Sequence, residues 1–340
     1  MAASDSASFV AGPDTGAESG KTNGLTLTVR AAGWMTLGAL VAFLTNNVLN
    51  NWFGWPGAGA VFGDASAQAW IQFLFYPAAW VAMIALVMST RSRDLRTDSV
   101  IISDINALLI RMMFFIVLYV GLVDAVISFL RVEGLLPAIF GDTMATNLGI
   151  SSFRGVYFHM PALVLGVMSA FLTRTLGFQW LALLAVAAEL LIVISRFVFS
   201  YEQAFMADLV RFWYAALFLF ASAHTLLAEG HVRVDVLYSA FSTRAKGRSN
   251  TIGSVLLGIS LCWVVLLIGM DGKSAIINSP LLAFETTQTG FGMYVKYLMA
   301  GYLAVFAISM MIQFVSYTLD AVADWRGDPG GHDHDVHAVQ

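Results

Sequence analysis

Four ionisable side chains lie inside long apolar runs of the sequence, where a charge must be buried in lipid or in protein. Arg111, Asp124 and Glu189 fall well within such runs, and Arg196 falls near the end of one. Because a charge is costly to bury in a bilayer, such residues often mark ion or proton pathways. No second acid recurs at a spacing that would build a pathway, so we favour bonding to neighbouring helices for Asp124 and Glu189. Glu189 and Arg196 are seven residues apart, which places them on one helix face about 10 Å from each other.

Two histidines, His159 and His224, also fall within apolar runs and raise the possibility of a haem site. A haem held by two histidines requires both at a similar depth in the membrane. Here they lie near opposite sides of the membrane, about 15 Å or more apart in depth, so shared coordination of one iron is not expected. A third group is interpreted as a solvated, flexible tail rather than a metal site: His332, Asp333, His334, Asp335 and His337.

The remaining sequence offers no catalytic signature. We find no nucleophile motif, phosphate-binding loop or dinucleotide fingerprint. The single cysteine, Cys262, lies in an apolar run, which excludes an intrachain disulfide and a multi-cysteine metal cluster. We therefore predict that the protein is not an enzyme, carries no cofactor and does not bind nucleic acid.

The composition indicates an integral membrane protein of the all-α class. Apolar residues make up 58% of the 340 residues and charged residues 12%, with a mean hydropathy of +0.75, whereas soluble domains carry about 25% charged residues. A membrane-spanning helix requires roughly 20 apolar residues. By that criterion the sequence predicts eight spans: 31–50, 67–89, 106–130, 156–174, 178–199, 208–228, 251–270 and 296–320.

The distribution of cationic residues predicts the orientation of these spans. Segments rich in Lys and Arg usually remain in the cytoplasm. With eight spans, one side of the membrane receives the two most basic linkers and both termini, so both termini are expected to be cytoplasmic. The linker cations on that side are Arg91, Arg93, Arg96, Arg174, Arg233, Arg244, Lys246 and Arg248.

The linker after the sixth span contains an amphipathic pattern. Apolar residues recur with helical spacing from Val234 through Leu237 and Phe241. Such a helix can lie in the cytoplasmic headgroup region with its cations near lipid phosphates. We therefore predict one cytoplasmic interfacial helix that binds membrane lipids, with an ordinary soluble connector as the alternative. Its cations would be Arg244, Lys246 and Arg248.

Three short motifs in the second half of the chain carry a family resemblance. Arg196 to Phe199 has the form Arg-aromatic-x-Phe at the end of a span, and Phe205 with Asp208 opens the next span. Gly230 to Asp235 reads Gly-His-Val-Arg-Val-Asp, with His231 and Arg233 inside it. On these motifs, the segment from about 177 to 323 resembles the small membrane subunit of tripartite ATP-independent periplasmic (TRAP) transporters. Phe205 and Asp208 stand where that family commonly has Trp and Glu.

The resemblance implies a function and a division of the chain. Residues 177–323 would form a four-span small-permease region in a bacterial inner membrane, bracing a large, substrate-translocating subunit. A periplasmic solute-binding protein would deliver the solute, and transport is expected to be coupled to sodium. The other parts would be a disordered tail (1–28), an additional four-span region of unassigned role (29–176) and a flexible tail (324–340). The alternatives are a cytochrome b-like electron-transfer subunit and a stand-alone transporter, although the inverted repeat of many transporters is not visible.

The predicted orientation leads to a labelling experiment in intact cells. In a Cys262→Ala background, single cysteines introduced as Ser92→Cys or Ser242→Cys should resist a membrane-impermeant thiol reagent, because both positions are expected to be cytoplasmic. A cysteine introduced as Ser279→Cys should react, because it lies in the loop expected on the opposite side. Labelling in the reverse pattern would show that the orientation is inverted.

Overall fold

The computed structural model describes residues 24–63, 66–174, 178–228, 238–284 and 292–330, and all regular elements in these ranges are helices. Eight helical segments are long and apolar enough to cross a membrane, which confirms the predicted fold class. They are α1 (Gly24–Phe53), α2 (Ala67–Ser89), α3 (Leu95–Val132), α6 to α7 (Ser151–Leu172), α8 (Phe178–Phe199), α9 (Ala204–Leu227), α10 to α11 (Thr243–Gly269) and α13 (Lys296–Arg326).

Short elements lie between and within these spans. The fourth span contains α6 (Ser151–Arg154), the π-helical turn η2 (Gly155–His159) and α7 (Met160–Leu172), and the seventh contains α10 (Thr243–Gly253), the π-helical turn η3 (Ser254–Ile259) and α11 (Ser260–Gly269). The connections contain η1 (Ala58–Phe62), α4 (Leu136–Phe140), α5 (Asp142–Leu148) and α12 (Asn278–Ala283). Each predicted span therefore corresponds to one helical segment.

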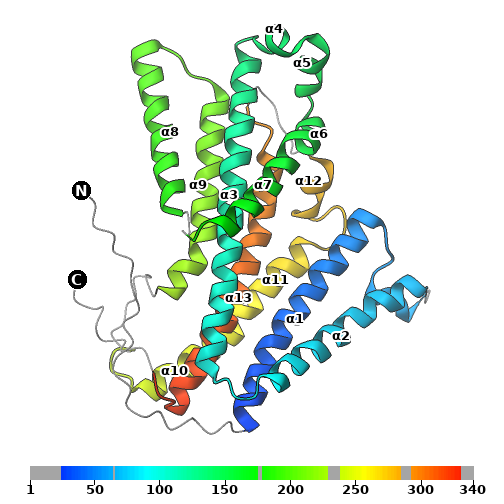
Figure 1. Ribbon diagram of the computed structural model, residues 1–340, viewed down its shortest axis with the longest axis vertical. Coiled ribbons are helices and arrows are strands. Elements are labelled where there is room, and N and C mark those ends of the chain that lie inside the picture. Colours follow the sequence, from blue (N-terminus) through cyan, green and yellow to red (C-terminus); the bar gives the residue numbers. More distant parts are fainter. Residues whose placement is uncertain (1–23, 64–65, 175–177, 229–237, 285–291, 331–340) are drawn as a thin grey trace.

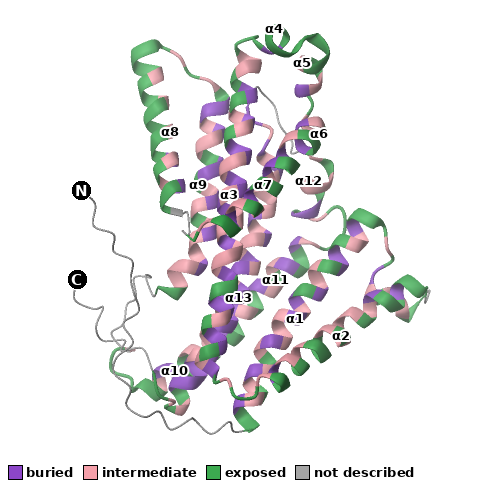
Figure 2. Cartoon of the chain, in the orientation of Figure 1, coloured by how far each residue is buried: buried purple, intermediate pink, exposed green. Residues whose placement is uncertain are grey.

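The helix α13 lies at the centre of the bundle, beside α3 (Figure 1). It contacts α1, α3, α9, α10, η3, α11 and α12. One apolar core joins α3, α7, α8, α9 and the beginning of α13, and a second joins α1, α11 and the remainder of α13. Buried residues accordingly concentrate along α3, α9 and α13, whereas α8 and α2 are largely exposed (Figure 2).

A row of buried polar side chains joins α3 to α13. The Asn106 Nδ2 donates to the Ser309 carbonyl at 3.0 Å, and Ser103 Oγ lies 2.8 Å from Ser316 Oγ. The Gln313 Nε2 also donates to Ser103 Oγ at 3.2 Å. Hydrogen bonds between membrane helices stabilise their association because lipid offers these groups no alternative partner. The first four spans and the last four therefore pack as one body.

The first span begins earlier, and the last span ends later, than the apolar runs predict. The helix α1 begins at Gly24, within the segment predicted as a tail to residue 28, and α13 ends at Arg326, within the predicted tail from 324. Polar contacts explain these extensions, because Arg326 Nη1 donates to Thr26 Oγ1 at 2.6 Å and Arg96 pairs with Asp324 at 2.8 Å. Hydropathy alone does not detect helical turns that polar contacts hold.

The predicted interfacial helix is wrong over its described part. Residues 238–241 form turns, so Phe241 is not helical, and Leu237 lies outside the described residues. The helix begins at Thr243, where the Ser242 Oγ caps it by accepting from the Ala245 backbone N, and it runs on without a break into the seventh span. The cations predicted for a separate helix therefore occupy the first turns of that span: Arg244, Lys246 and Arg248.

Close packing of α10 against α13 depends on a glycine. A methyl group at Gly247 would lie 2.5 Å from the Trp325 backbone N and 2.7 Å from the Ala321 carbonyl O, whereas one at Gly253 would meet nothing within 4 Å. We expect Gly247→Ala to lower the free energy of unfolding by about 1–3 kcal/mol, because the helices must separate. Gly253→Ala should leave it unchanged or raise it by up to about 1 kcal/mol through helix propensity. Thermal unfolding in detergent measures both, and equal behaviour of the two variants would contradict the packing.

Candidate functional site

A buried polar cluster surrounds Asp124, whose side chain is completely buried on α3. Its Oδ1 lies 2.8 Å from Arg154 Nη1 and 3.3 Å from His159 Nε2. Its Oδ2 accepts a 2.7 Å hydrogen bond from the Tyr294 backbone N. We call Asp124 with Arg154, His159 and the segment 292–297 the Asp124 network. It joins the first half of the chain to the beginning of α13.

The short elements before α7 position Arg154 and His159, the two side chains that contact Asp124. Arg154 ends α6, where its Nε donates to the Leu148 carbonyl at 2.5 Å and its Nη1 donates to Ser128 Oγ at 3.0 Å. His159 follows at the end of η2, and such π-helical turns are frequent at functional sites. The wider turn and the Arg154 contacts together hold both side chains against α3.

His159 connects Asp124 to α13 through its second ring nitrogen. Its Nδ1 lies 2.9 Å from the Tyr297 hydroxyl, and the two rings stack at 5.8 Å between centroids. Both nitrogens of His159 are therefore engaged by protein groups. His224 lies in the last turn of α9. Among the described residues no group of three or more His, Cys, Asp or Glu side chains is placed to hold a metal ion.

A second carboxylate, Asp208 on α9, contacts the same segment before α13. Its Oδ2 accepts from the Met293 backbone N at 3.1 Å, and its Oδ1 lies 3.0 Å from Lys296 Nζ. Asp124 and Asp208 thus receive the consecutive backbone N–H groups of Tyr294 and Met293. The positive end of the α13 dipole lies nearby and favours both charges. Two acids from different halves of the chain therefore fix where α13 begins.

Tyr294 lies between two guanidinium groups of this region. Arg131 Cζ is 4.5 Å and Arg154 Cζ 4.3 Å from the centroid of its ring. Arg131 Nη2 also donates to the Gly292 carbonyl at 2.9 Å. Arg131 Nε and Arg154 Nη2 have no hydrogen-bond acceptor among the described residues, so the ring face provides cation–π contacts to these groups. Arg131 and Arg154 thus hold both the ring of Tyr294 and the backbone beside it, and the described residues form no continuous chain of acids for ion movement.

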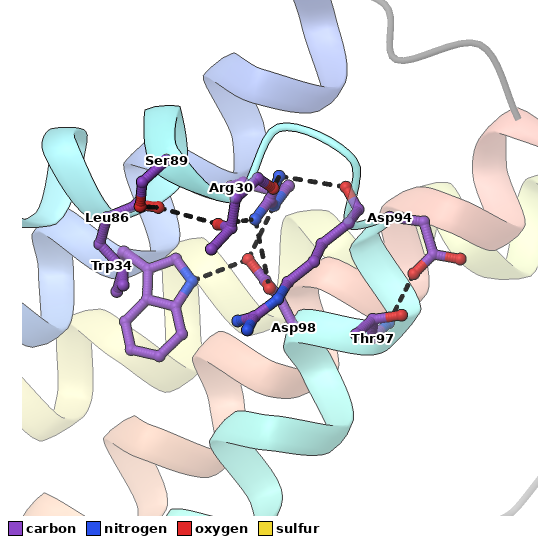
Figure 3. A network of polar contacts seen from close by, with 9 residues as sticks. Arg30, Trp34, Leu86, Ser89, Asp94, Thr97 and Asp98 are labelled. Carbon is purple, nitrogen blue, oxygen red and sulfur yellow. Dashed lines mark hydrogen bonds and ion pairs between the residues drawn. The ribbon is translucent and has the colours of Figure 1, made fainter.

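A separate buried ion pair joins α1 to α3 near their first turns (Figure 3). Arg30 Nε lies 2.7 Å from Asp98 Oδ2, and the Trp34 Nε1 donates to the same oxygen at 2.8 Å. Arg30 Nη1 donates to the carbonyls of Thr90 and Arg93 at 2.9 and 3.0 Å. The pair and its hydrogen bonds satisfy both buried charges, and they fix the α2–α3 linker to α1.

The acids and the arginine singled out from the sequence, as intramembrane charges or as motif residues, differ in their surroundings. Asp124 and Asp208 are buried and paired, as described above. Arg196 is exposed, and its Nε lies 3.3 Å from Glu202 Oε2 rather than near Glu189. Glu189 is exposed on α8 and has no hydrogen-bond or ion partner among the described residues. A carboxylate at the centre of a bilayer costs about 2.5–3.5 kcal/mol on insertion scales.

The other predicted site residues lie at the opposite end of the bundle or outside the described ranges. Lys246 is buried, with its Nζ 5.5 Å from the centroid of the Tyr238 ring. The guanidinium group of Arg244 lies beside Gly327, just after α13. The corner motif and one interfacial residue fall outside the described residues: Gly230, His231, Arg233, Asp235 and Leu237.

Sequence reasoning missed Arg154 and the pair of Arg30 with Asp98. Arg154 reads as a loop cation, because nothing in the sequence marks the short helices before α7. Asp98 had a detectable signal: Asp94 is a favourable helix N-cap, and its Oδ1 accepts from the Thr97 backbone N at 2.8 Å. Partial burial opposes ionisation of Asp94, but the hydrogen bonds from Thr97 outweigh it and lower the pKa of this carboxyl group. A cap at this position would have placed Asp98 in the first turn of α3.

Comparison with known proteins identifies one family. Residues 184–324, fewer than half of the chain, match the model for the DctQ component of tripartite ATP-independent periplasmic transporters. The match confirms the resemblance recognised in the sequence, and the helices before residue 184 form an additional N-terminal region. No curated protein and no solved structure matches the chain.

The Asp124 network leads to a stability prediction. Asp124→Asn should lower the free energy of unfolding by about 3–5 kcal/mol, because it leaves the Arg154 charge buried without its counter-ion. Asp142→Asn, at an exposed acid on α5, should change it by less than about 0.5 kcal/mol. Replacing both members of the pair, Asp124→Asn with Arg154→Met, should recover part of the loss. Unfolding in detergent measures these changes. Equal stability of Asp124→Asn and Asp142→Asn would contradict a stabilising role for the buried ion pair.

Proposed function

We propose that this chain is the small permease component of a tripartite secondary importer in a bacterial inner membrane. The observation that carries the proposal is the family match over residues 184–324. That range includes most of α8, the whole of α9 and of the α10–α11 span, and α13 up to residue 324, which agrees with the four-span region expected for such a subunit. The first four spans lie outside the match.

The proposed role is to brace a large, substrate-translocating subunit rather than to move solute. The described charges agree with this role, because the buried acids Asp124 and Asp208 are engaged by Arg154, Lys296 and backbone N–H groups. A transported ion would have to displace these partners. In the proposed complex a periplasmic solute-binding protein delivers the solute, and the large subunit couples its movement to sodium.

The first four spans are proposed to stiffen the small-permease region. Asp124, Arg154 and His159 all come from this additional part of the chain, and they contact the segment that begins α13. The row of polar contacts between α3 and α13 adds a second attachment. Because α13 is the central helix, fixing it fixes the surface that the four matching spans present to a partner.

A corner between the sixth and seventh spans is proposed to act in assembly. Gly230 permits a sharp turn, His231 or Arg233 can donate to the last carbonyls of the preceding span, and Asp235 can cap a following turn. A cap of this kind contributes about 1 kcal/mol. The double variant Arg233→Ala with Asp235→Ala should therefore weaken assembly with the large subunit and solute uptake together, at normal expression. If the double variant still recovers the large subunit and takes up solute normally, the corner only connects the two spans.

Purification of the tagged chain from native membranes tests the proposed function. We expect a larger multi-span permease to co-purify, and a periplasmic binding protein to be required for solute uptake in proteoliposomes. A haem absorption band that disappears with His159→Ala or His224→Ala would favour the electron-transfer alternative. Solute uptake by the chain alone would favour a stand-alone transporter. Either result, or the lack of any permease partner, would overturn the proposal.

A further inference from the structure

Glu189 lies near the middle of α8, with its side chain exposed on the surface of the bundle. The helix around it is apolar, and Val186, Leu190 and Val193 are exposed at 62%, 57% and 50%. At the 1.5 Å rise of a helix, the middle of α8 lies near the centre of a hydrocarbon core about 30 Å thick. A carboxylate is thus directed outward at the depth where water and lipid headgroups are least accessible.

The described residues of the chain do not neutralise this charge. Arg196 lies two turns along the same face, but its guanidinium group is directed to Glu202 in the α8–α9 connection, at 3.3 Å. No other described residue forms a hydrogen bond or an ion pair with Glu189. Ionisable residues within membrane spans almost always face a protein partner or a water-filled cavity. An acid that faces away from its own bundle therefore indicates a partner outside the chain.

The packing of α8 leaves this face free. The helix packs on α9 and contacts α3 only slightly, and it lies at the edge of the bundle (Figure 1). Its remaining surface is exposed along its length (Figure 2). On the inward flank, an apolar cavity of about 390 Å³ separates Ala188 and Leu191 from α3. The outward face with Glu189 is thus a separate surface, which we define as the Glu189 face: Val186, Glu189 and Val193.

We propose that the Glu189 face is the contact surface for the large permease subunit, and that a Lys or Arg on a membrane helix of that subunit pairs with Glu189. The inference rests on the proposed function, which supplies the partner. Charge complementarity identifies the chemistry: each charge would be disfavoured alone in lipid, and each satisfies the other when they meet. The apolar neighbours Val186 and Val193 would pack around the ion pair and exclude lipid.

Two other occupants fit this face less well. A second copy of the chain in a two-fold contact would present the same patch to itself, which would bring two Glu189 carboxylates together. A lipid molecule carries its charges at the headgroup level and offers only hydrocarbon near the bilayer centre. A cationic side chain on a partner helix is the occupant that provides an opposite charge at this depth.

Site-specific crosslinking in the assembled complex tests the location. A photoreactive residue at Val193, in the full chain with Glu189 retained, should crosslink to the large subunit. The same residue at Val81, exposed at 66% on α2, should crosslink to that subunit at least fivefold less. Crosslinks from Val193 to a second copy of the chain, or to lipid alone, would overturn the inference.

Substitution of the acid tests the charge pair. Glu189→Leu makes α8 more apolar and so preserves membrane insertion, yet it should lower recovery of the large subunit about tenfold, because the partner's cation is left unpaired. Glu189→Gln should cause a smaller loss, and Leu190→Ala, at an exposed neighbour, should leave recovery within about twofold of the original chain. Full recovery with Glu189→Leu would overturn the charge pair while the proposed function stands. If the unaltered chain recovers no large subunit, the proposed function itself fails.

Discussion

The beginning of α13 is held by carboxylates that lie in a poorly solvated environment. In such surroundings a buried charge must be compensated locally, and Asp124 achieves this with Arg154, His159 and the Tyr294 backbone N–H. Asp208 accepts in the same way from the backbone N–H of the preceding residue, Met293. Because the preferred geometry of these contacts is narrow, they define the position at which α13 enters the bundle. The packing of the surrounding helices follows from that position.

Polar contacts at three levels join the two halves of the chain. The Asp124 network lies at one end of α13, the serine and amide contacts with α3 lie along its middle, and Arg96 pairs with Asp320 and Asp324 near its other end. Apolar contacts alone would allow the helices to slide, since lipid competes equally well for apolar surface. Directional contacts at several depths fix the register of α3 against α13. The additional spans are therefore integrated into the same scaffold as the spans of the matched range 184–324.

The sequence predicted the all-α class and the eight spans because apolar runs of membrane length are a strong signal. It did not predict contacts between runs: Asp124 was identified as an unusual buried acid, but nothing in the sequence selected Arg154 as its partner 30 residues away. The interfacial helix was wrong because the spacing of Phe241 fits a helical face, whereas Ser242 provides a helix N-cap that begins the next span instead. Periodicity detects a possible helix, and capping decides where the helix begins.

The long separation of these partners along the chain bears on biosynthesis. Asp124 and Tyr294 are 170 residues apart, which at roughly 5–20 residues per second corresponds to about 10–30 s of translation. During that interval α3 has entered the membrane, while α13, which provides the remaining polar contacts of α3, has not yet been made. Arg154 emerges within a few seconds and can shield the acid first. The last span then docks against the earlier spans, so newly made chains pass through a stage in which Asp124 still lacks its contact with the segment before α13.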